Sequence, residues 1–223
     1  MLAKPSVLPL RPASAHQSFI DALEQLYRER TLIAYKAGQT ISLQQGALLV
    51  VCRGIVQLST IQPDGCETLL GLAGPSTPIG LPLTIINPYW ATALTDVDVL
   101  PLAMAEIEAS PVLMAGLGHN LVGRLQQTEA WLAISGKRLV VDRLHHLLVL
   151  LAQELGQVEP SGVRIPVRLT HHQLATAIGT TRVTVTRLLK DFKTQGWLKT
   201  HHRYFIVNWE QLNIASTSES SLF

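Results

Sequence analysis

The sequence is poor in cysteine and in charge, and it lacks long apolar runs. Its 223 residues include two cysteines, Cys52 and Cys66, too few for a disulfide framework or an iron–sulfur cluster held by four thiolates. Charged residues make up 15% of the chain and apolar residues 47%, which excludes a disordered protein and provides for a sizeable core. The roughly 18 uninterrupted apolar residues of a transmembrane helix are missing, as is the pattern of a secretory signal. We therefore expect a cytoplasmic protein with reduced thiols and no membrane partner.

The sequence also lacks the residue clusters of most enzymes and metal proteins. It contains no glycine-rich phosphate loop, no nucleophile elbow and no group of histidines and carboxylates. Histidines come as adjacent pairs at 145–146, 171–172 and 201–202, and neighbouring side chains on a helix point about 100° apart, so a pair cannot hold a metal from one helix face. We expect these histidines at the surface or beside phosphates. We expect no metal site and no catalytic residue, which argues against a β-roll enzyme.

Charge is distributed unevenly along the chain. Residues 1–136 hold 7 Lys and Arg against 10 Asp and Glu, whereas residues 137–223 hold 11 against 6. Nucleic acids attract basic surfaces, so any contact with DNA is expected in the second part of the chain. Charge alone does not establish such a contact.

The first half of the chain has the pattern of an antiparallel β-roll. A helix is predicted over residues 17–30, where apolar residues recur on one face. Short strands follow, and Asp64–Gly65 marks a hairpin because tight turns favour this pair. Many short strands in succession are typical of a sandwich or barrel. The predicted strands are residues 32–35, 40–43, 48–52, 55–60, 68–72, 91–95 and 97–102.

The pattern then changes to that of helices. A short helix is predicted over residues 104–110, a long one from Pro111 to Ser135, which Gly136 follows as a hinge, and another over 138–155. The apolar stripe of the long helix runs for more than three turns. We interpret it as the seam of a dimer, with packing against the chain's own barrel as the alternative. The stripe consists of Leu113, Leu117, Leu121, Leu125, Thr128 and Leu132.

Residues 169–192 have the pattern of a helix-turn-helix. Thr170 is placed to cap a short helix, Gly179 permits a tight turn, and Thr180 or Thr181 caps a second helix. Apolar residues of the second helix recur at the spacing of one buried face. They are Val185, Leu188, Leu189 and Phe192. Strands at 197–200 and 204–208 predict a following hairpin, a wing, with the basic tip His201–Arg203.

The exposed face of the second helix suits DNA. Arg187 can donate two hydrogen bonds to guanine, Val183 suits a thymine methyl, and Arg182 can reach a base edge or a phosphate. Helix N-termini and hydroxyls suit phosphate oxygens. We expect phosphate contacts from Thr170, His171, Thr181, Thr184, His201 and Arg203. The alternative is a ligand-sensing protein whose winged helix docks protein, which would show a shallower salt dependence.

The run Ile178-Gly-Thr-Thr-Arg-Val-Thr-Val-Thr-Arg-Leu-Leu189 resembles the CRP/FNR superfamily of bacterial transcription regulators, and most of all its cyanobacterial nitrogen-control (NtcA-like) branch. The resemblance covers nearly the whole chain. It implies an α+β fold: an N-terminal β-roll (jelly roll, residues 1–110) of effector type, a dimerisation helix with a hinge (111–136) and a winged helix-turn-helix (137–223). It also implies Arg182, Val183 and Arg187 as base readers on GTA-like half-sites. RNA polymerase is the implied partner, touched by surface loops such as 153–162.

The resemblance also implies places where an effector would bind. In CRP a Gly-Glu pair and a later Arg-Ser hold cyclic AMP, but this chain has Gly80 and Leu81 followed by Pro82, so we do not expect it to bind cyclic AMP. Relatives that bind 2-oxoglutarate use a roll arginine, which is Asn87 here, and an Arg and a Glu that match Arg124 and Glu129. One arginine leaves a dicarboxylate under-neutralised. Another small ligand, ligand-independent dimerisation and a protein co-regulator remain open.

Overall fold

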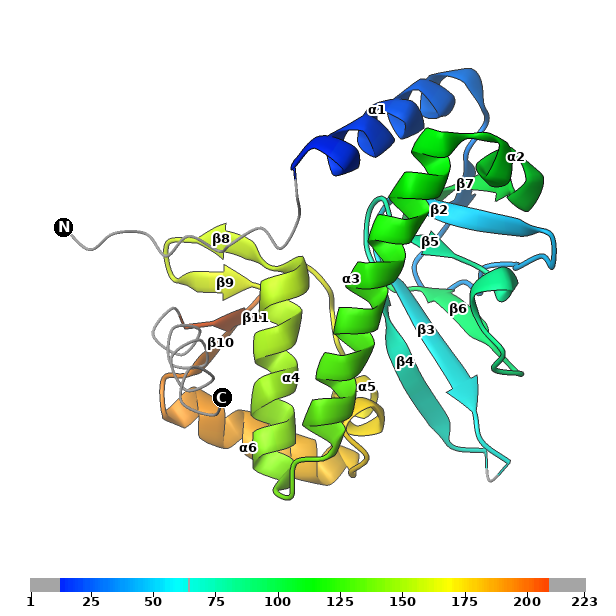
Figure 1. Cartoon of the computed structure of the whole chain (residues 1–223). Helices are drawn as coiled ribbons and strands as arrows, with labels where there is room; N and C mark the ends of the chain where they lie inside the picture. The colour runs from blue at the N-terminus through cyan, green and yellow to red at the C-terminus, as the bar shows by residue number, and fades with distance from the viewer. Residues whose placement is uncertain (1–12, 64, 209–223) are drawn as a thin grey trace, which may run out of the picture. The chain divides into compact units, whose positions relative to one another are not determined.

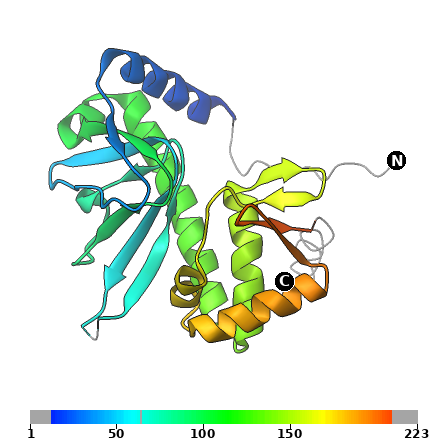
Figure 2. The ribbon, with the colours of Figure 1, turned by 180° about the vertical axis from the view of Figure 1, so that it is seen from behind.

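The chain forms two compact units, shown in the computed structural model of Figure 1 and from behind in Figure 2. The structure describes residues 13–63 and 65–208. The boundary between the units falls within helix α3 (Pro111–Ser135), after Glu129. Among the described residues, none of the helices combines the length and the apolar character that a membrane span requires.

The first unit is an antiparallel β-roll, as predicted. One sheet has the strand order β1-β7-β2-β5 and the other β4-β3-β6, and every pair of neighbours runs antiparallel. A 3₁₀ turn, η1 (Leu81–Leu83), follows β5. The strands are β1 (Ile33–Tyr35), β2 (Ala47–Arg53), β3 (Val56–Ile61), β4 (Glu67–Ala73), β5 (Pro78–Ile79), β6 (Trp90–Ala93) and β7 (Val97–Ala103).

Alternate residues of β2 and β7 enter two different cores. Leu49 and Val51 face the interior between the two sheets, whereas Leu48 and Val50 face the opposite side of the same strand. There they pack with residues of α1 (Ala13–Glu29), α2 (Met104–Ala109) and the first turns of α3. Because the strand is covered on both faces, its sequence is a continuous apolar run rather than an alternating one.

A glycine brings α1 close to α3. A Cβ atom at Gly116 would lie 1.9 Å from the ring of Phe19, which is 3% exposed in the second of these cores. No side chain can occupy that space, so Gly116 allows the aromatic ring to rest directly on the backbone of α3. This contact attaches α1 to the roll and covers one sheet face.

Two details of the predicted roll are wrong. The segment 40–43 is not a strand, since it forms a single bridge from Thr40 to Thr92, although Ile41 is buried in the roll. The two-residue strand β5 was missed. Such short pairings are decided by which strand lies alongside, and the period of the sequence carries no signal over two residues.

The second unit contains the predicted winged helix-turn-helix. Its helices are α4 (Val140–Leu155), α5 (His171–Ala177) and α6 (Arg182–Thr194), and its sheet has the order β10-β11-β9-β8. The strands β10 (Leu198–His201) and β11 (Tyr204–Val207) confirm the predicted wing. The strands β8 (Gln157–Glu159) and β9 (Gly162–Arg164) form a hairpin where a surface loop was predicted.

His145 is half-buried, and its ring packs in an aromatic cluster of the second unit, so it is not the freely exposed surface histidine that was predicted. Its ring lies 4.6 Å from the ring of Trp197 and 6.3 Å from that of Phe192. Burial, followed by the nearby charges of His146 and Lys137, lowers the pKa of His145 below its ordinary value, against an opposing effect of Asp142. The imidazole therefore acts as a neutral aromatic group in this cluster.

The predicted stripe of α3 is wrong in its first two residues. Leu113 and Leu117 are only 6% and 7% exposed, because they pack in the chain's own core with α1 and the roll. They are therefore not available to a second copy of the chain. The other members, Leu121, Leu125, Thr128 and Leu132, are exposed.

Candidate nucleic-acid interface

The start of α5 is held by a capping box on Thr170. The Thr170 hydroxyl oxygen accepts a hydrogen bond from the amide of Gln173 at 3.1 Å, and the Gln173 side chain accepts one from the amide of Thr170 at 2.8 Å. The Thr170 hydroxyl also donates to Gln173 Oε1 at 3.0 Å. Its proton is thus in use, so the free donors at this end of α5 are backbone amides of the first turn.

A glycine makes the turn between the two helices. Gly179 has a φ of +61°, in the left-handed region, and the amide of Thr180 donates to the carbonyl of Ala175 at 3.0 Å. This is the Schellman arrangement, which ends a helix and turns the chain sharply. A Cβ atom at Gly179 would meet only Arg143 Nη1, at 4.0 Å, so the backbone conformation rather than crowding requires the glycine.

Helix α6 begins at a second threonine cap and has one buried face. Thr181, one of the two predicted caps, accepts a hydrogen bond from the amide of Thr184 at 3.2 Å. Val185, Leu189 and Phe192 are buried, as predicted, whereas Leu188 is half-buried. The buried face fixes the rotation of the helix and so decides which side chains remain outside.

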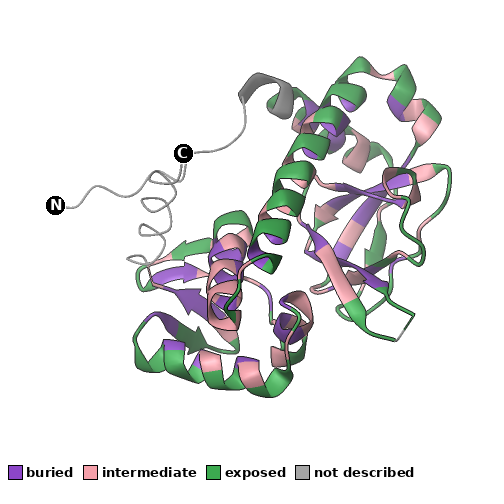
Figure 3. Cartoon of the chain, turned by 60° about the horizontal axis from the view of Figure 1, so that its bottom comes forward, coloured by how far each residue is buried: buried purple, intermediate pink, exposed green. Residues whose placement is uncertain are grey.

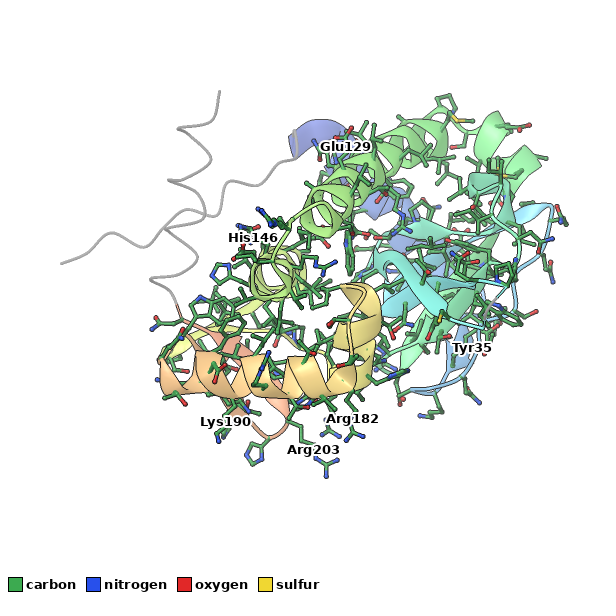
Figure 4. All side chains as sticks on the ribbon, turned by 90° about the horizontal axis from the view of Figure 1, so that it is seen from below. Tyr35, Glu129, His146, Arg182, Lys190 and Arg203 are labelled. Carbon is green, nitrogen blue, oxygen red and sulfur yellow. The ribbon has the colours of Figure 1, made fainter. Side chains whose placement is uncertain are left out.

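The opposite face of α6 is open and basic. Val183 is 78% exposed, and Arg182, Arg187 and Lys190 are exposed as well. Figure 3 shows the outer side of α6 as largely exposed, and Figure 4 shows Arg182 and Lys190 projecting from the side of α6 that faces away from α4. The structure thus brings the predicted base readers together on one solvent-facing surface, which we call the α6 face.

His171 connects the start of α5 to the α6 face. Its Nδ1 lies 2.8 Å from the hydroxyl oxygen of Thr186, and that hydroxyl donates to the carbonyl of Arg182 at 2.9 Å. Partial burial, followed by the positive charges of Lys193 and Arg182, lowers the pKa of His171. The link to Thr186 was not predicted from the sequence, because the two residues belong to different helices.

The wing ends in a tight turn built without glycine. His201 pairs with Tyr204, which leaves His202 and Arg203 as the two turn residues, with φ values of +47° and +73°. Both values are in the left-handed region, which non-glycine residues adopt at a cost. His201, His202 and Arg203 are exposed, and in Figure 4 Arg203 projects to the same side as Arg182.

The residues matched to an effector site lie in the first unit, and Glu129 is on a different side of α3 from Arg124. Gly80 is buried, and a Cβ atom there would come within 3.1 Å of the Ala47 carbonyl; Leu81 is half-buried in η1. Arg124 donates to Gln127 Oε1 at 2.8 Å and to the carbonyls of Leu72 and Leu70 at 3.4 and 3.5 Å. Glu129 is exposed, and a separation of five residues turns it about 140° around α3 from Arg124.

Two residues of this region were missed by sequence reasoning. Gln127 accepts the amide of Leu72 at 3.2 Å as well as the Arg124 guanidinium. At Gly71, a Cβ atom would lie 2.5 Å from Gln127 Oε1 and 2.6 Å from Arg124 Nη1. A glycine within a predicted strand is a signal of close approach, and Gly71 carries that signal.

Comparisons with known proteins agree with this architecture. Residues 142–214 match the model of the Crp-like helix-turn-helix domain. The regulatory protein CysR of Synechococcus elongatus is 34% identical over 161 residues, which cover 71% of this chain and 74% of that protein. A global nitrogen regulator of Synechocystis sp. is 32% identical over 151 residues, covering 63% and 67%. A CRP/FNR-family transcriptional regulator of Thermus thermophilus has a TM-score of 0.66 at 25% identity over 84% of this chain and 98% of the other.

The β-roll, the winged helix-turn-helix and these relatives define the class of this protein: it is a DNA-binding transcription regulator of the helix-turn-helix type. The chain belongs to the CRP/FNR family. The resemblance read from residues 178–189 and the predicted fold class are thereby confirmed. The relatives are named as regulators, not as enzymes.

Proposed function

We propose that this chain is a homodimeric, sequence-specific regulator that binds a near-palindromic DNA site with GTA-like half-sites. The observation that carries the proposal is the α6 face, where Arg182, Val183 and Arg187 are exposed together. Under this proposal Arg187 reads a guanine, Val183 contacts a thymine methyl, and Arg182 reaches a base or a phosphate. The two α6 helices of a dimer would enter successive major grooves about 34 Å apart.

The proposed phosphate contacts surround the α6 face. They come from the start of α5, the start of α6 and the wing tip, which the second unit presents as exposed or half-buried groups. Since the Thr170 hydroxyl is engaged in its capping box, the first-turn amides of α5 take its place as donors. The residues concerned are Thr170, His171, Thr181, Thr184, His201 and Arg203. We assign this role to residues 137–223, dimerisation and the hinge to 111–136, and a β-roll of effector type to 1–110.

Dimerisation is proposed along the exposed stripe of α3. The exposed residues Met114, Gly118, Leu121, Leu125, Thr128 and Leu132 follow one another at steps of four and three. This is the spacing of a two-helix seam, and it begins one residue later than the stripe that includes Leu113 and Leu117. Leu125 and Leu132 are 58% and 72% exposed, so a second copy of α3 would remove large apolar side chains from water.

Charge reversal on the seam tests the dimer. Leu125→Glu with Leu132→Glu should give a monomer with unchanged helical circular dichroism, because neither side chain belongs to a core of the chain. Gln126→Glu with Ala133→Glu is the matched control, since it adds the same charges at exposed positions of another face and should leave a dimer. Sedimentation velocity measures the outcome. A seam variant that stays dimeric would contradict the proposed interface.

The proposal favours regulation without a small-molecule effector. Cyclic AMP is not proposed, because the side chain of Leu81 offers no acceptor to a ribose hydroxyl and Pro82 has no amide hydrogen. A 2-oxoglutarate molecule beside Gly80, Leu81 and Arg124 would compete with the carbonyls that Arg124 already contacts, and Glu129 lies on another side of α3. We therefore favour dimerisation without a ligand, and a protein co-regulator is the next candidate. RNA polymerase is the proposed partner of the β8–β9 hairpin, where Val158 is 68% exposed.

Selection of bound sites from random duplex DNA tests the whole proposal. Carried out with and without cyclic AMP and 2-oxoglutarate, it yields the half-site, its spacing and any effector dependence. Arg187→Ala should cost about 1–3 kcal/mol and relax one base position. Lys190→Ala, a matched exposed position on α6, should leave the base preference unchanged. An Arg187→Ala variant that loses affinity equally for every sequence would refute base reading. Binding without a salt dependence would favour the alternative, in which the winged helix docks protein.

A further inference from the structure

Two arginines lie close to the aromatic ring of Tyr204, the first residue of the wing strand β11. Tyr204 lies next to the turn, paired with His201. The guanidinium carbon of Arg164, from β9, lies 5.1 Å from the centre of the Tyr204 ring, and that of Arg168, from the segment before α5, lies 5.4 Å away. Both distances are within the range of a cation–π interaction.

The two arginines differ in how their charges are balanced. Arg164 forms an ion pair with Glu159 at 2.5 Å and a hydrogen bond with Gln157, so its charge is used within the β8–β9 hairpin. Arg168 is exposed, and within residues 13–63 and 65–208 it takes part in none of the ion pairs. Its positive charge is therefore available to a partner outside the chain.

The ring of Tyr204 restricts the side chain of Arg168 without using its hydrogen-bond donors. A guanidinium has five N–H donors, and an aromatic ring attracts its positive charge without serving as a conventional acceptor for those donors. A free arginine side chain loses rotamer entropy when it binds, and a chain that is already held loses less. Arg168 is thus an exposed donor group that the wing holds in place.

The position of Arg168 relates it to the other proposed phosphate contacts. It lies two residues before Thr170, whose capping box opens α5, and its guanidinium lies over a ring adjacent to the wing turn. The start of α5 and the wing tip are both parts of the DNA-facing surface proposed above. The side chain of Arg168 therefore links the start of α5 to the wing.

We propose that Arg168 binds a backbone phosphate of DNA and that Tyr204 is the positioning residue that holds it. This inference rests on the proposed function. A phosphate carries no base information, so Arg168 adds affinity for every sequence rather than preference for one. Each neutralised phosphate makes the fall of log affinity with log salt concentration steeper by about 0.9. This contribution corresponds to roughly eightfold in affinity at 0.1 M salt.

Fluorescence anisotropy with the full chain tests the role of Arg168. Two labelled duplexes are used, the selected site and a scrambled sequence, over a series of salt concentrations. Arg168→Ala should weaken binding to both duplexes by a similar factor, of roughly eightfold at 0.1 M salt, and reduce the salt slope by about one. Unchanged affinity and slope, or a loss on only one duplex, would overturn the proposal. If the wild-type chain binds neither duplex, it is the proposed function that fails.

Variants of Tyr204 separate positioning from a structural role. Tyr204→Phe keeps the ring and should bind like wild type, whereas Tyr204→Leu removes the ring and should weaken binding about two- to fivefold. In an Arg168→Ala background, Tyr204→Leu should cause no further loss. An equal loss in both backgrounds would show that Tyr204 acts only on the fold, and would overturn its assigned role. Thermal unfolding of each variant identifies any that are destabilised.

Discussion

The affinity of this protein for DNA should depend on pH through His171. The Arg182 carbonyl can only accept a hydrogen bond, so the hydroxyl proton of Thr186 is directed to it. Thr186 must then accept from Nδ1 of His171, which lies 2.8 Å away. The neutral imidazole therefore carries its proton on Nδ1, and its other nitrogen, Nε2, is an acceptor.

A phosphate needs a donor at that second nitrogen. Neutral His171 presents a lone pair to a negatively charged group, whereas protonated His171 donates from Nε2 and attracts it. In the free protein the pKa of His171 is below its ordinary value because of partial burial and the charges of Lys193 and Arg182. DNA would raise that pKa, so binding takes up a proton.

The sign and size of the effect follow from linkage. Affinity is greatest at low pH, falls as the pH rises from the pKa of free His171 through the higher pKa of the complex, and is constant above both. Each unit by which DNA raises the pKa corresponds to about tenfold in affinity between the two limits. Because one histidine takes up at most one proton, the affinity for DNA changes by at most about tenfold per pH unit.

Titrations of the selected duplex between about pH 5.5 and 8, at constant ionic strength, measure this dependence. His171→Gln should flatten it, whereas His172→Gln, the exposed neighbour, should not. A dependence that persists in His171→Gln and disappears in His201→Gln would place the proton on the wing. That result would refute the argument from Thr186.

Three further predictions concern stability. Gly116→Ala should lower the unfolding free energy of the first unit by about 1–3 kcal/mol in denaturant titrations, because its Cβ would overlap Phe19; Gly123→Ala, where a Cβ meets nothing within 4 Å, should not destabilise it. The second unit should lose stability as the pH falls below about 6.5, since unfolded His145 takes up a proton that the folded cluster resists; His145→Phe should flatten this loss in thermal unfolding, and equal pH profiles would contradict it. Replacing His202–Arg203 by Asn–Gly should stabilise the wing by about 1 kcal/mol or more while weakening DNA binding, and a gain in both would show that the tip is not a contact.

Local residue chemistry explains why the helix-turn-helix was predictable. Threonines that accept amide hydrogen bonds start both helices, and Gly179 adopts the left-handed conformation that the turn requires. These signals involve residues three or four positions apart, so they can be recognised from the sequence alone. The buried face of α6 follows from its period, and the side chains that this period leaves exposed include the proposed base readers.

The stripe of α3 shows where such reasoning ends. Steps of three and four can be written from Leu113 or from Met114, and both versions share residues from Leu121 onward. Only the packing of α1 and the roll decides that Leu113 and Leu117 belong to the core. The period of a helix defines a face, but not which neighbour covers it.

By itself, then, the amino-acid order determined the class of fold, the two helices of the helix-turn-helix and the side chains they expose, because caps, turns and periodicity depend on near neighbours. The tertiary structure alone decided the packing of His145 against Trp197, the bond from His171 to Thr186, and the contact of Arg168 with the Tyr204 ring. Each of these joins residues more than a dozen positions apart. Contacts of that kind depend on how elements pack, and packing is a property of the whole unit.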